Sequence, residues 1–306
     1  MPGRVVRRCR RCHQCTLGDG AVHVDSAGFD CCRGKQRWHH QFSDNSSISV
    51  NGAADVLTAT GAGSVIDARS GTQITVNDPG RGIFMENGGL VYIDNTTNLH
   101  VNAPTGGFGI GILGTTVPAG VIGSGVTIHL DFPNASATGL ELNTSSATFD
   151  NLTVTGSGSG FAVQVAVDST LTLTGTAHLD SSAAGGAVLK ASGTNAVITG
   201  DACANISHDD GNSIYGAVAA TGGGQIELTC GMDITAAGNF THGVYAESAG
   251  SFVDATHGTK IEMTGTGSSS TVTMALDGLV KLDGTTKIDV LGPDDIGISL
   301  WDTKRA

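Results

Sequence analysis

The chain has 306 residues with a formal net charge of −12, and it contains 46 glycines but only six prolines. A chain this acidic repels nucleic acids and anionic membrane surfaces, so neither is an expected partner. No segment approaches the run of about 20 apolar residues that a membrane-spanning helix needs, and no apolar run of signal-peptide length follows the basic start.

The first 40 residues differ sharply in composition from the remainder. They hold eight of the 16 basic residues, only three acidic ones, and five of the seven cysteines. The following residues carry eight basic and 25 acidic side chains. Such a change indicates a boundary. We therefore predict a basic, cysteine-rich segment over 1–40, either unstructured or translated from a wrong start or frame, and one repeat domain over 41–306.

The cysteines of this basic segment do not match a known metal-binding spacing. They are Cys9, Cys12, Cys15, Cys31 and Cys32, and His39-His40 follows them. A zinc ribbon needs a second Cys-x2-Cys pair, whereas here the second pair is adjacent. Nor do aromatic residues interleave the arginines, as a nucleic-acid-binding arm would favour. We predict no metal site and no cofactor here.

A glycine followed by apolar residues returns about every 27 positions after this segment. The members are Gly82, Gly109, Gly139, Gly160, Gly186, Gly216, Gly243 and Gly297. The first and last are 215 residues apart, which is close to eight periods of 27. A fixed period of this length is typical of a repeat architecture.

Each repeat reads as three short strands separated by turns. In the repeat that begins at Gly243, the strands are expected over 243–246, 251–254 and 259–264, with Gly-containing turns between them. The repeat over 55–81 has the same three parts. No segment shows the 3.6-residue apolar period of a helix.

Strands of about four residues cannot bury an apolar face alone, but strands of successive repeats can stack. Each coil then adds one strand to each of three parallel sheets, and the inward side chains form one continuous core. We therefore predict an all-β parallel β-helix, or solenoid, of about ten coils with a period near 27 residues. We expect the segments 103–125 and 200–215 to be loops that the rod presents to partners.

Two cysteines lie inside the repeat region, one period apart. Cys203 and Cys230 each precede the next repeat glycine, Gly216 or Gly243, by 13 residues. Equivalent positions on adjacent coils are about 4.8 Å apart, which suits a disulfide. The pair is therefore a disulfide candidate that would link two coils, and the alternative is two buried thiols that pack as small apolar side chains.

Several acidic and basic residues are candidates for catalysis. They are Asp67, Arg69, Asp78 and Arg81 in neighbouring coils, His208 with Asp209 and Asp210, and Asp294 with Asp295. A polysaccharide-degrading site needs carboxylates and cations that converge on one face of the rod. Aspartates in turns are more commonly present for their own backbone hydrogen bonds. We therefore predict no catalytic residue.

The repeats resemble those of bacterial autotransporter passenger domains of the pertactin-like type. The resemblance rests on 216–224 and 243–251, where a glycine, an apolar strand and a Gly- or Ser-rich turn follow one another, and it covers roughly 45–302. It implies a right-handed β-helix, export to the cell surface of a Gram-negative bacterium or secretion, and adhesion to protein or glycan ligands of a host or cell surface.

The resemblance carries no catalytic residues over to this chain. It implies contact with the membrane only through a translocator barrel, which this chain does not include, and an export signal is likewise not visible in it. The expected function is a surface-exposed, adhesin-like stalk without catalysis. The alternative is a polysaccharide-degrading β-helix enzyme, either a lyase or a glycoside hydrolase.

Overall fold

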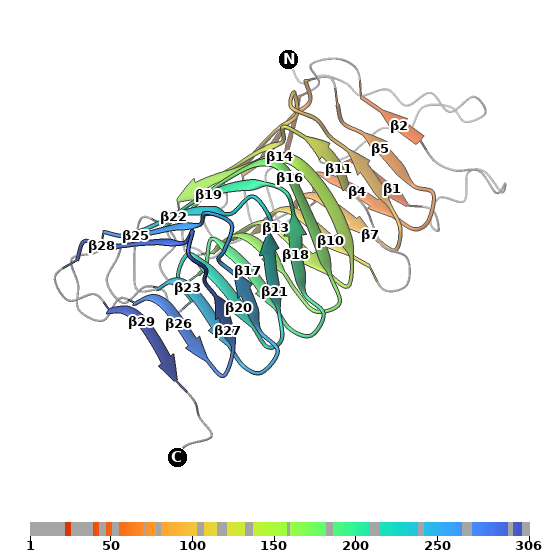
Figure 1. The fold of residues 1–306 in the computed structure, drawn as a ribbon. Coiled ribbons are helices and arrows are strands. Elements are labelled where there is room, and N and C mark those ends of the chain that lie inside the picture. The colour runs from red at the N-terminus through yellow and green to blue at the C-terminus, as the bar shows by residue number, and fades with distance from the viewer. Residues whose placement is uncertain are drawn as a thin grey trace, which may run out of the picture.

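The computed structural model of this chain shows a β-solenoid (Figure 1). It describes residues 22–25, 39–42, 47–50, 55–69, 71–77, 81–102, 107–114, 121–131, 137–157, 160–181, 186–208, 215–237, 242–264, 271–292 and 296–301. Every regular element in these ranges is a strand. No helix that is long and apolar enough to span a membrane occurs in this part of the chain.

One wall of the solenoid is a sheet of eleven parallel strands, which we call the first sheet. Its strands, in spatial order, are β1 (Val22–Asp25), β4 (Leu57–Thr60), β7 (Arg81–Glu86), β10 (Gly107–Leu113), β13 (Ala137–Asn143), β15 (Phe161–Val165), β17 (Leu189–Ser192), β20 (Val218–Thr221), β23 (His242–Glu247), β26 (Thr271–Leu276) and β29 (Ile296–Trp301). Spatial order equals chain order, as stacking of successive coils requires.

The other two walls belong to one 18-stranded sheet, because two long strands pass around the corner between them. These are β14 (Ser146–Ser157) and β16 (Thr170–Ser181). The second wall also contains β2 (His39–Gln41), β5 (Val65–Asp67), β8 (Leu90–Tyr92), β11 (Val121–Ser124), β18 (Val197–Gly200), β21 (Gln225–Leu228), β24 (Phe252–Asp254) and β27 (Leu279–Lys281). The third contains β3 (Ser47–Val50), β6 (Gln73–Val76), β9 (Asn98–Asn102), β12 (Thr127–Asp131), β19 (Cys203–His208), β22 (Met232–Ala236), β25 (Lys260–Met263) and β28 (Lys287–Val290).

The predicted all-β parallel solenoid with a period near 27 residues is therefore confirmed. The predicted number of about ten coils was too high, because the solenoid has about seven turns. Coils at the two ends have a neighbour on one side only. In the coil of β27 and β28, for example, Val290 is exposed, whereas its register partner Met263 in the preceding coil is fully buried.

The core fills the inside of the solenoid with side chains from all three walls. Along β23, Val244 and Ala246 point inward and are fully buried, whereas Tyr245 between them belongs to a separate cluster. Alternation of this kind follows from the two-residue side-chain period of a strand. Parallel register repeats it on each neighbouring strand, so the apolar columns run along the rod.

Two of the repeat glycines face this core at positions that have no room for a side chain. A Cβ atom at Gly82 would lie 2.5 Å from Leu99 Cδ1, and one at Gly109 would lie 2.8 Å from Ile128 Cγ2. Strand pairing places small or β-branched side chains in the same column in later coils, namely Ala162, Val188 and Ala217. Gly82 and Gly109 thus permit close packing of the first and third walls.

Corners between the second and third walls are fastened by a recurring Asp-x-Thr-Thr turn. Asp94 Oδ1 accepts hydrogen bonds from the amide (2.9 Å) and hydroxyl (2.5 Å) of Thr96, while the Thr97 hydroxyl donates to Ala68 O of the preceding coil (2.9 Å). Asp283–Thr286 makes the same set of bonds, which lowers the pKa of the Asp283 carboxyl to about 2. These aspartates have a structural role at the corners.

Several strands lie where the sequence analysis predicted an unstructured segment or a loop. β1 and most of β2 lie before the boundary expected at 40/41, and they pair in parallel with β4 and β5. The segments 103–125 and 200–215, expected to be loops, contain β10, β11 and β19. In β10 glycine alternates with phenylalanine or isoleucine over 107–112, so the sequence lacks the apolar–polar alternation that marks a half-exposed strand.

Candidate functional site

A second apolar cluster lies on the outer side of the first sheet, separate from the core. Strand register brings Glu141, Gln164, Lys190, Ala219 and Tyr245 into one outward column on β13, β15, β17, β20 and β23. Five further residues border this column, namely Phe161, Ala187, Tyr215, His242 and Glu247. We call these ten residues the Lys190 patch.

Lys190 lies at the centre of this patch between two aromatic rings. Its Nζ atom is 3.5 Å from the ring centroid of Tyr215 and 4.9 Å from that of Phe161, and the residue is only 6% exposed. Burial lowers the pKa of the Lys190 ammonium, and the charge of Glu247 opposes this effect. Among the described residues no carboxylate lies within ion-pair distance of Nζ. Cation–π contacts therefore provide much of its stabilisation.

Tyr245 extends the aromatic surface toward the C-terminal coils. The His242 ring stacks on it with a centroid distance of 5.3 Å and an interplanar angle of 10°, and the Tyr215 ring meets it edge-on at 6.2 Å. Burial, followed by the nearby charge of Glu247, raises the pKa of the Tyr245 hydroxyl to about 12. Tyr245 is thus a neutral hydrogen-bonding group at physiological pH.

Small residues in the outward positions make room for these rings. Ala187 and Ala219 are completely buried in the outer cluster, on which Phe161 and Tyr215 pack as partly exposed side chains. The partly exposed rings therefore form an apolar surface on the outside of the sheet.

A smaller cation–aromatic pair lies on the same face, three strands before Gln164. There the Arg81 guanidinium lies 3.3 Å from the ring centroid of Phe84, and it also pairs with Asp55 at 2.6 Å. Gly111 is the neighbour of Phe84 in the outward column, and a Cβ there would touch the ring at 3.4 Å. Small residues beside aromatic ones are therefore a repeated feature of this face.

Glu141 is a second residue of the Lys190 column whose pKa is shifted from its ordinary value. Burial raises the pKa of its carboxyl. In the described part of the chain no basic side chain lies within ion-pair distance of Glu141. Gln164 lies between it and Lys190, so the two charged groups are two strands apart, or about 10 Å along the rod. The patch thus combines apolar rings with hydrogen-bonding groups, as small-molecule sites do.

The catalytic candidates that the structure describes are Asp67, Arg69, Arg81 and His208, and they are spread over all three walls. Asp67 pairs with Arg69 at 2.5 Å on the second wall, and Arg69 also lies 5.3 Å from the Tyr92 ring centroid. Arg81 pairs instead with Asp55 on the first sheet, and His208 is fully buried. The remaining candidates, Asp78, Asp209, Asp210, Asp294 and Asp295, lie outside the described residues.

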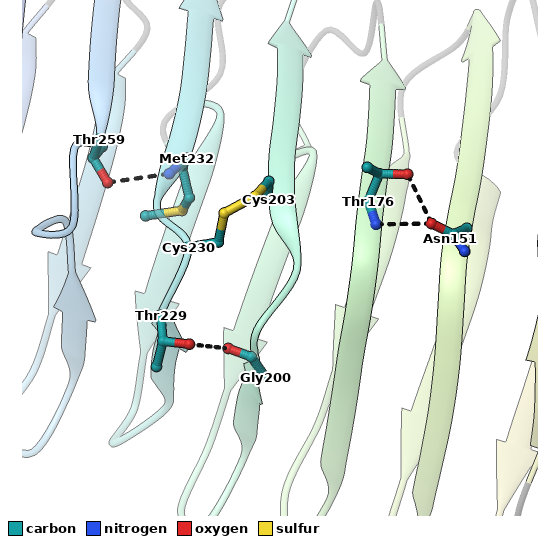
Figure 2. The surroundings of a disulfide bond; sticks show 8 residues. All are labelled: Asn151, Thr176, Gly200, Cys203, Thr229, Cys230, Met232 and Thr259. Atoms are coloured by element: carbon teal, nitrogen blue, oxygen red, sulfur yellow. Dashed lines mark hydrogen bonds between the residues drawn. A yellow bond between two sulfur atoms is a disulfide. The ribbon is translucent and has the colours of Figure 1, made fainter.

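Cys203 and Cys230 form a disulfide that links β19 to the turn between β21 and β22 (Figure 2). Their Cα atoms are 4.8 Å apart, the distance expected for equivalent positions on adjacent coils. Both residues are exposed, which is inconsistent with a pair of buried thiols. Nearby, the Thr229 hydroxyl donates to Gly200 O at 3.3 Å and joins the same two coils.

The five cysteines of the basic segment lie outside the described residues. Over the described ranges, no three side chains of His, Cys, Asp or Glu gather as metal ligands. Comparisons with protein-family models, with curated protein sequences and with solved structures found no match to this chain.

The Lys190 patch was not found from the sequence, because the repeat glycines do not mark equivalent positions in every coil. Glu141 and Tyr245 follow their repeat glycines by two residues, whereas Gln164 and Lys190 follow theirs by four. Strand pairing nevertheless places all four in one column. A lysine, a glutamate and a tyrosine between inward apolar residues were the signal that could have revealed it.

Proposed function

We propose that this chain is an adhesin-like stalk, the passenger region of a Gram-negative autotransporter, displayed at the cell surface or secreted. Its Lys190 patch binds a glycan of a host or neighbouring cell, without catalysis and without a cofactor. The observation that carries this proposal is the cluster of partly exposed aromatic rings on the outer side of the first sheet. Aromatic clusters on an outer surface are typical of interaction sites.

The solenoid suits a chain that crosses a membrane unfolded and folds on the far side. Each coil contacts mainly its two neighbours, so folding can begin in one coil and spread along the rod. From β4 to β29, the strand pairs of the first sheet connect residues 23–30 positions apart, for example Leu140 with Val163 and Gly107 with Ala137. No contact between distant coils has to form before the first coils are stable.

The chemistry of the patch favours a neutral glycan over an acidic one. The Phe161 and Tyr215 rings offer apolar faces for the C–H side of a sugar ring, and Gln164 and Glu141 offer hydrogen bonds to its hydroxyls. The patch contains two carboxyl groups, Glu141 and Glu247, but only one lysine, and the whole chain carries a net charge of −12. The carboxyl groups of the patch and the negative net charge of the chain would both repel an anionic ligand.

Glycan-array binding of the purified chain tests the adhesion proposal. We expect Tyr215→Ala to abolish binding to the neutral glycans that the wild type retains, because it removes the ring nearest Lys190. The matched control is Tyr92→Ala, since Tyr92 also lies beside a basic residue, Arg69, but on the second wall. Equal binding by wild type and Tyr215→Ala would contradict the proposal.

The autotransporter part of the proposal has its own test, independent of ligand binding. The DNA on both sides of the gene is sequenced and read in all frames. An in-frame signal peptide before the solenoid, or a translocator barrel after it, supports the assignment. Stop codons on both sides without either element would contradict it, while leaving glycan binding as a separate question.

A second candidate function, polysaccharide cleavage, is favoured by one observation. Burial moves the pKa values of Lys190 and Glu141 toward neutrality from opposite sides, which is a pattern found at acid–base sites. Release of reducing ends or of unsaturated products from polysaccharides would reveal such an activity. If the activity exists, Glu141→Gln should remove it, whereas Tyr92→Ala should not.

A further inference from the structure

Two histidines lie side by side on the outer surface of the third wall. His100 on β9 and His129 on β12 are register partners on adjacent strands, and both side chains are exposed. Their ring centroids are 4.9 Å apart, with the rings edge-on to each other. The pair borders a hollow of about 300 Å³ whose other polar lining residues are Gln73, Thr75, Asn98 and Thr127.

A hydrogen bond to the next coil orients one of the two rings. His129 Nδ1 lies 3.1 Å from the Thr155 hydroxyl on β14. When Nδ1 carries the proton, it donates to this oxygen, and the lone pair of Nε2 is left for a ligand. Metal-binding histidines commonly use their second ring nitrogen in this way, which fixes the tautomer and the ring orientation.

We propose that His100 and His129 bind a divalent transition-metal ion, such as Zn²⁺, Ni²⁺ or Cu²⁺, between the two coils. Imidazole nitrogens suit these three ions. Two imidazoles bound to one tetrahedral ion at about 2.0–2.1 Å have ring centroids about 5 Å apart. The observed separation of 4.9 Å is therefore compatible with one shared ion without movement of the strands.

The proposed metal site has two protein ligands, so several coordination positions stay open. No third His, Cys, Asp or Glu joins the pair among the described residues, so water fills the remaining coordination positions. Gln73, Asn98 and Thr127 line the same hollow and can hydrogen-bond those waters. The site lies on the third wall, and the Lys190 patch lies on the first sheet, so the two can be tested separately.

A metal bound here would join two coils, as the disulfide does further along the rod. The two histidines are 29 residues apart in sequence, and the unfolded chain does not hold them together. An ion that binds the folded protein more tightly than the unfolded chain stabilises the fold by mass action. Metal binding should therefore raise the melting temperature.

Calorimetric titration of the full chain with NiCl₂ tests the site. We expect the wild type to bind one more equivalent than the double variant His100→Gln/His129→Gln, and each single variant to bind at least tenfold more weakly. Cysteines and histidines of the basic segment are present in every variant, so the comparison removes their contribution. The matched control is His178→Ala, an exposed histidine of the same wall, which should bind like the wild type.

Two further measurements distinguish a metal site from a stacked pair of rings. NiCl₂ should raise the melting temperature of the wild type more than that of the double variant. Thr155→Val should weaken binding about tenfold, whereas Thr155→Ser, which keeps the hydroxyl, should restore it. If wild type and double variant, both folded by circular dichroism, give the same isotherm and the same thermal shift, the proposal is wrong.

Discussion

The two sides of the first sheet differ in what they repeat along the rod. The inner side carries buried apolar side chains in coil after coil, such as Ile83, Leu189 and Val244. The outer side changes from coil to coil, so that one column holds Glu141, a glutamine, a lysine, an alanine and then an aromatic ring. The inner side therefore makes the coils alike and stackable, and a binding site can only arise on the outer side, where they differ.

Neighbouring residues of one strand give the largest contrast between these sides. Leu189 points into the core and Lys190 points out. Leu189→Ala should lower the free energy of unfolding by about 3 kcal/mol, because it leaves a cavity. Lys190→Met should change it by less than about 1 kcal/mol, because the aliphatic stem is kept and a buried charge is removed. Urea unfolding of both variants measures the difference, and similar losses would refute this division of roles.

The disulfide tests whether an exposed crosslink contributes as much to the free energy of unfolding as a buried core side chain does. Cys203→Ser/Cys230→Ser removes a crosslink that closes a loop of 27 residues. The free energy of unfolding should fall by about 3 kcal/mol under oxidising conditions. The wild type treated with a reductant should fall to the same value, whereas the reductant should leave the double variant unaffected. A wild type whose stability does not respond to reductant would contradict the crosslink.

A glycine that faces the core tests how tightly the inner side of the first sheet is packed. In Gly109→Ala the new Cβ would lie 2.5 Å from Gly139 O and 2.8 Å from Ile128 Cγ2, so two walls must move apart. We expect a loss of about 2 kcal/mol in the free energy of unfolding. The matched control is Gly284→Ala, because nothing lies within 4 Å of a Cβ there. Equal stability of the two variants would show that this column is loosely packed.

The smallest expected effect is on the pH dependence of stability, and it comes from the ion pair between Asp254 and Lys281. Burial acts to raise the pKa of Asp254, but hydrogen bonds from Thr256 and Lys281 outweigh it and hold the pKa below its ordinary value. A carboxyl whose pKa is lowered on folding stabilises the protein above its unfolded pKa. This contribution is lost as the pH falls below about 4.

Asp254→Asn isolates this contribution from the other carboxyl groups. The wild type should be more stable than the variant at neutral pH, and the difference should shrink as the pH falls from about 5 toward about 2. Chemical unfolding at several pH values measures it. A difference that stays constant, or grows, at acidic pH would mean that the Asp254 carboxylate does not stabilise the fold.

The fold was predictable because the inner side imposes one pattern on every coil. Short alternating segments and a glycine that returns every 27 residues were enough to predict a parallel solenoid, and the same period placed Cys203 opposite Cys230. Strand limits were harder to predict. β10 alternates glycine with apolar residues, and β1 lies in a segment whose composition differs from that of the repeats.

The sequence by itself determined the architecture, since strands this short bury their apolar faces only by stacking at a constant period. Only the tertiary structure decided which outward residues meet. Coil lengths that vary between 23 and 30 residues from β4 onward shift the outward positions relative to the repeat glycines, so Lys190 and Tyr245 align only once the strands are paired. His100 and His129 likewise become neighbours because β9 and β12 pair in register. Contacts between coils depend on register, which the sequence of one repeat does not specify.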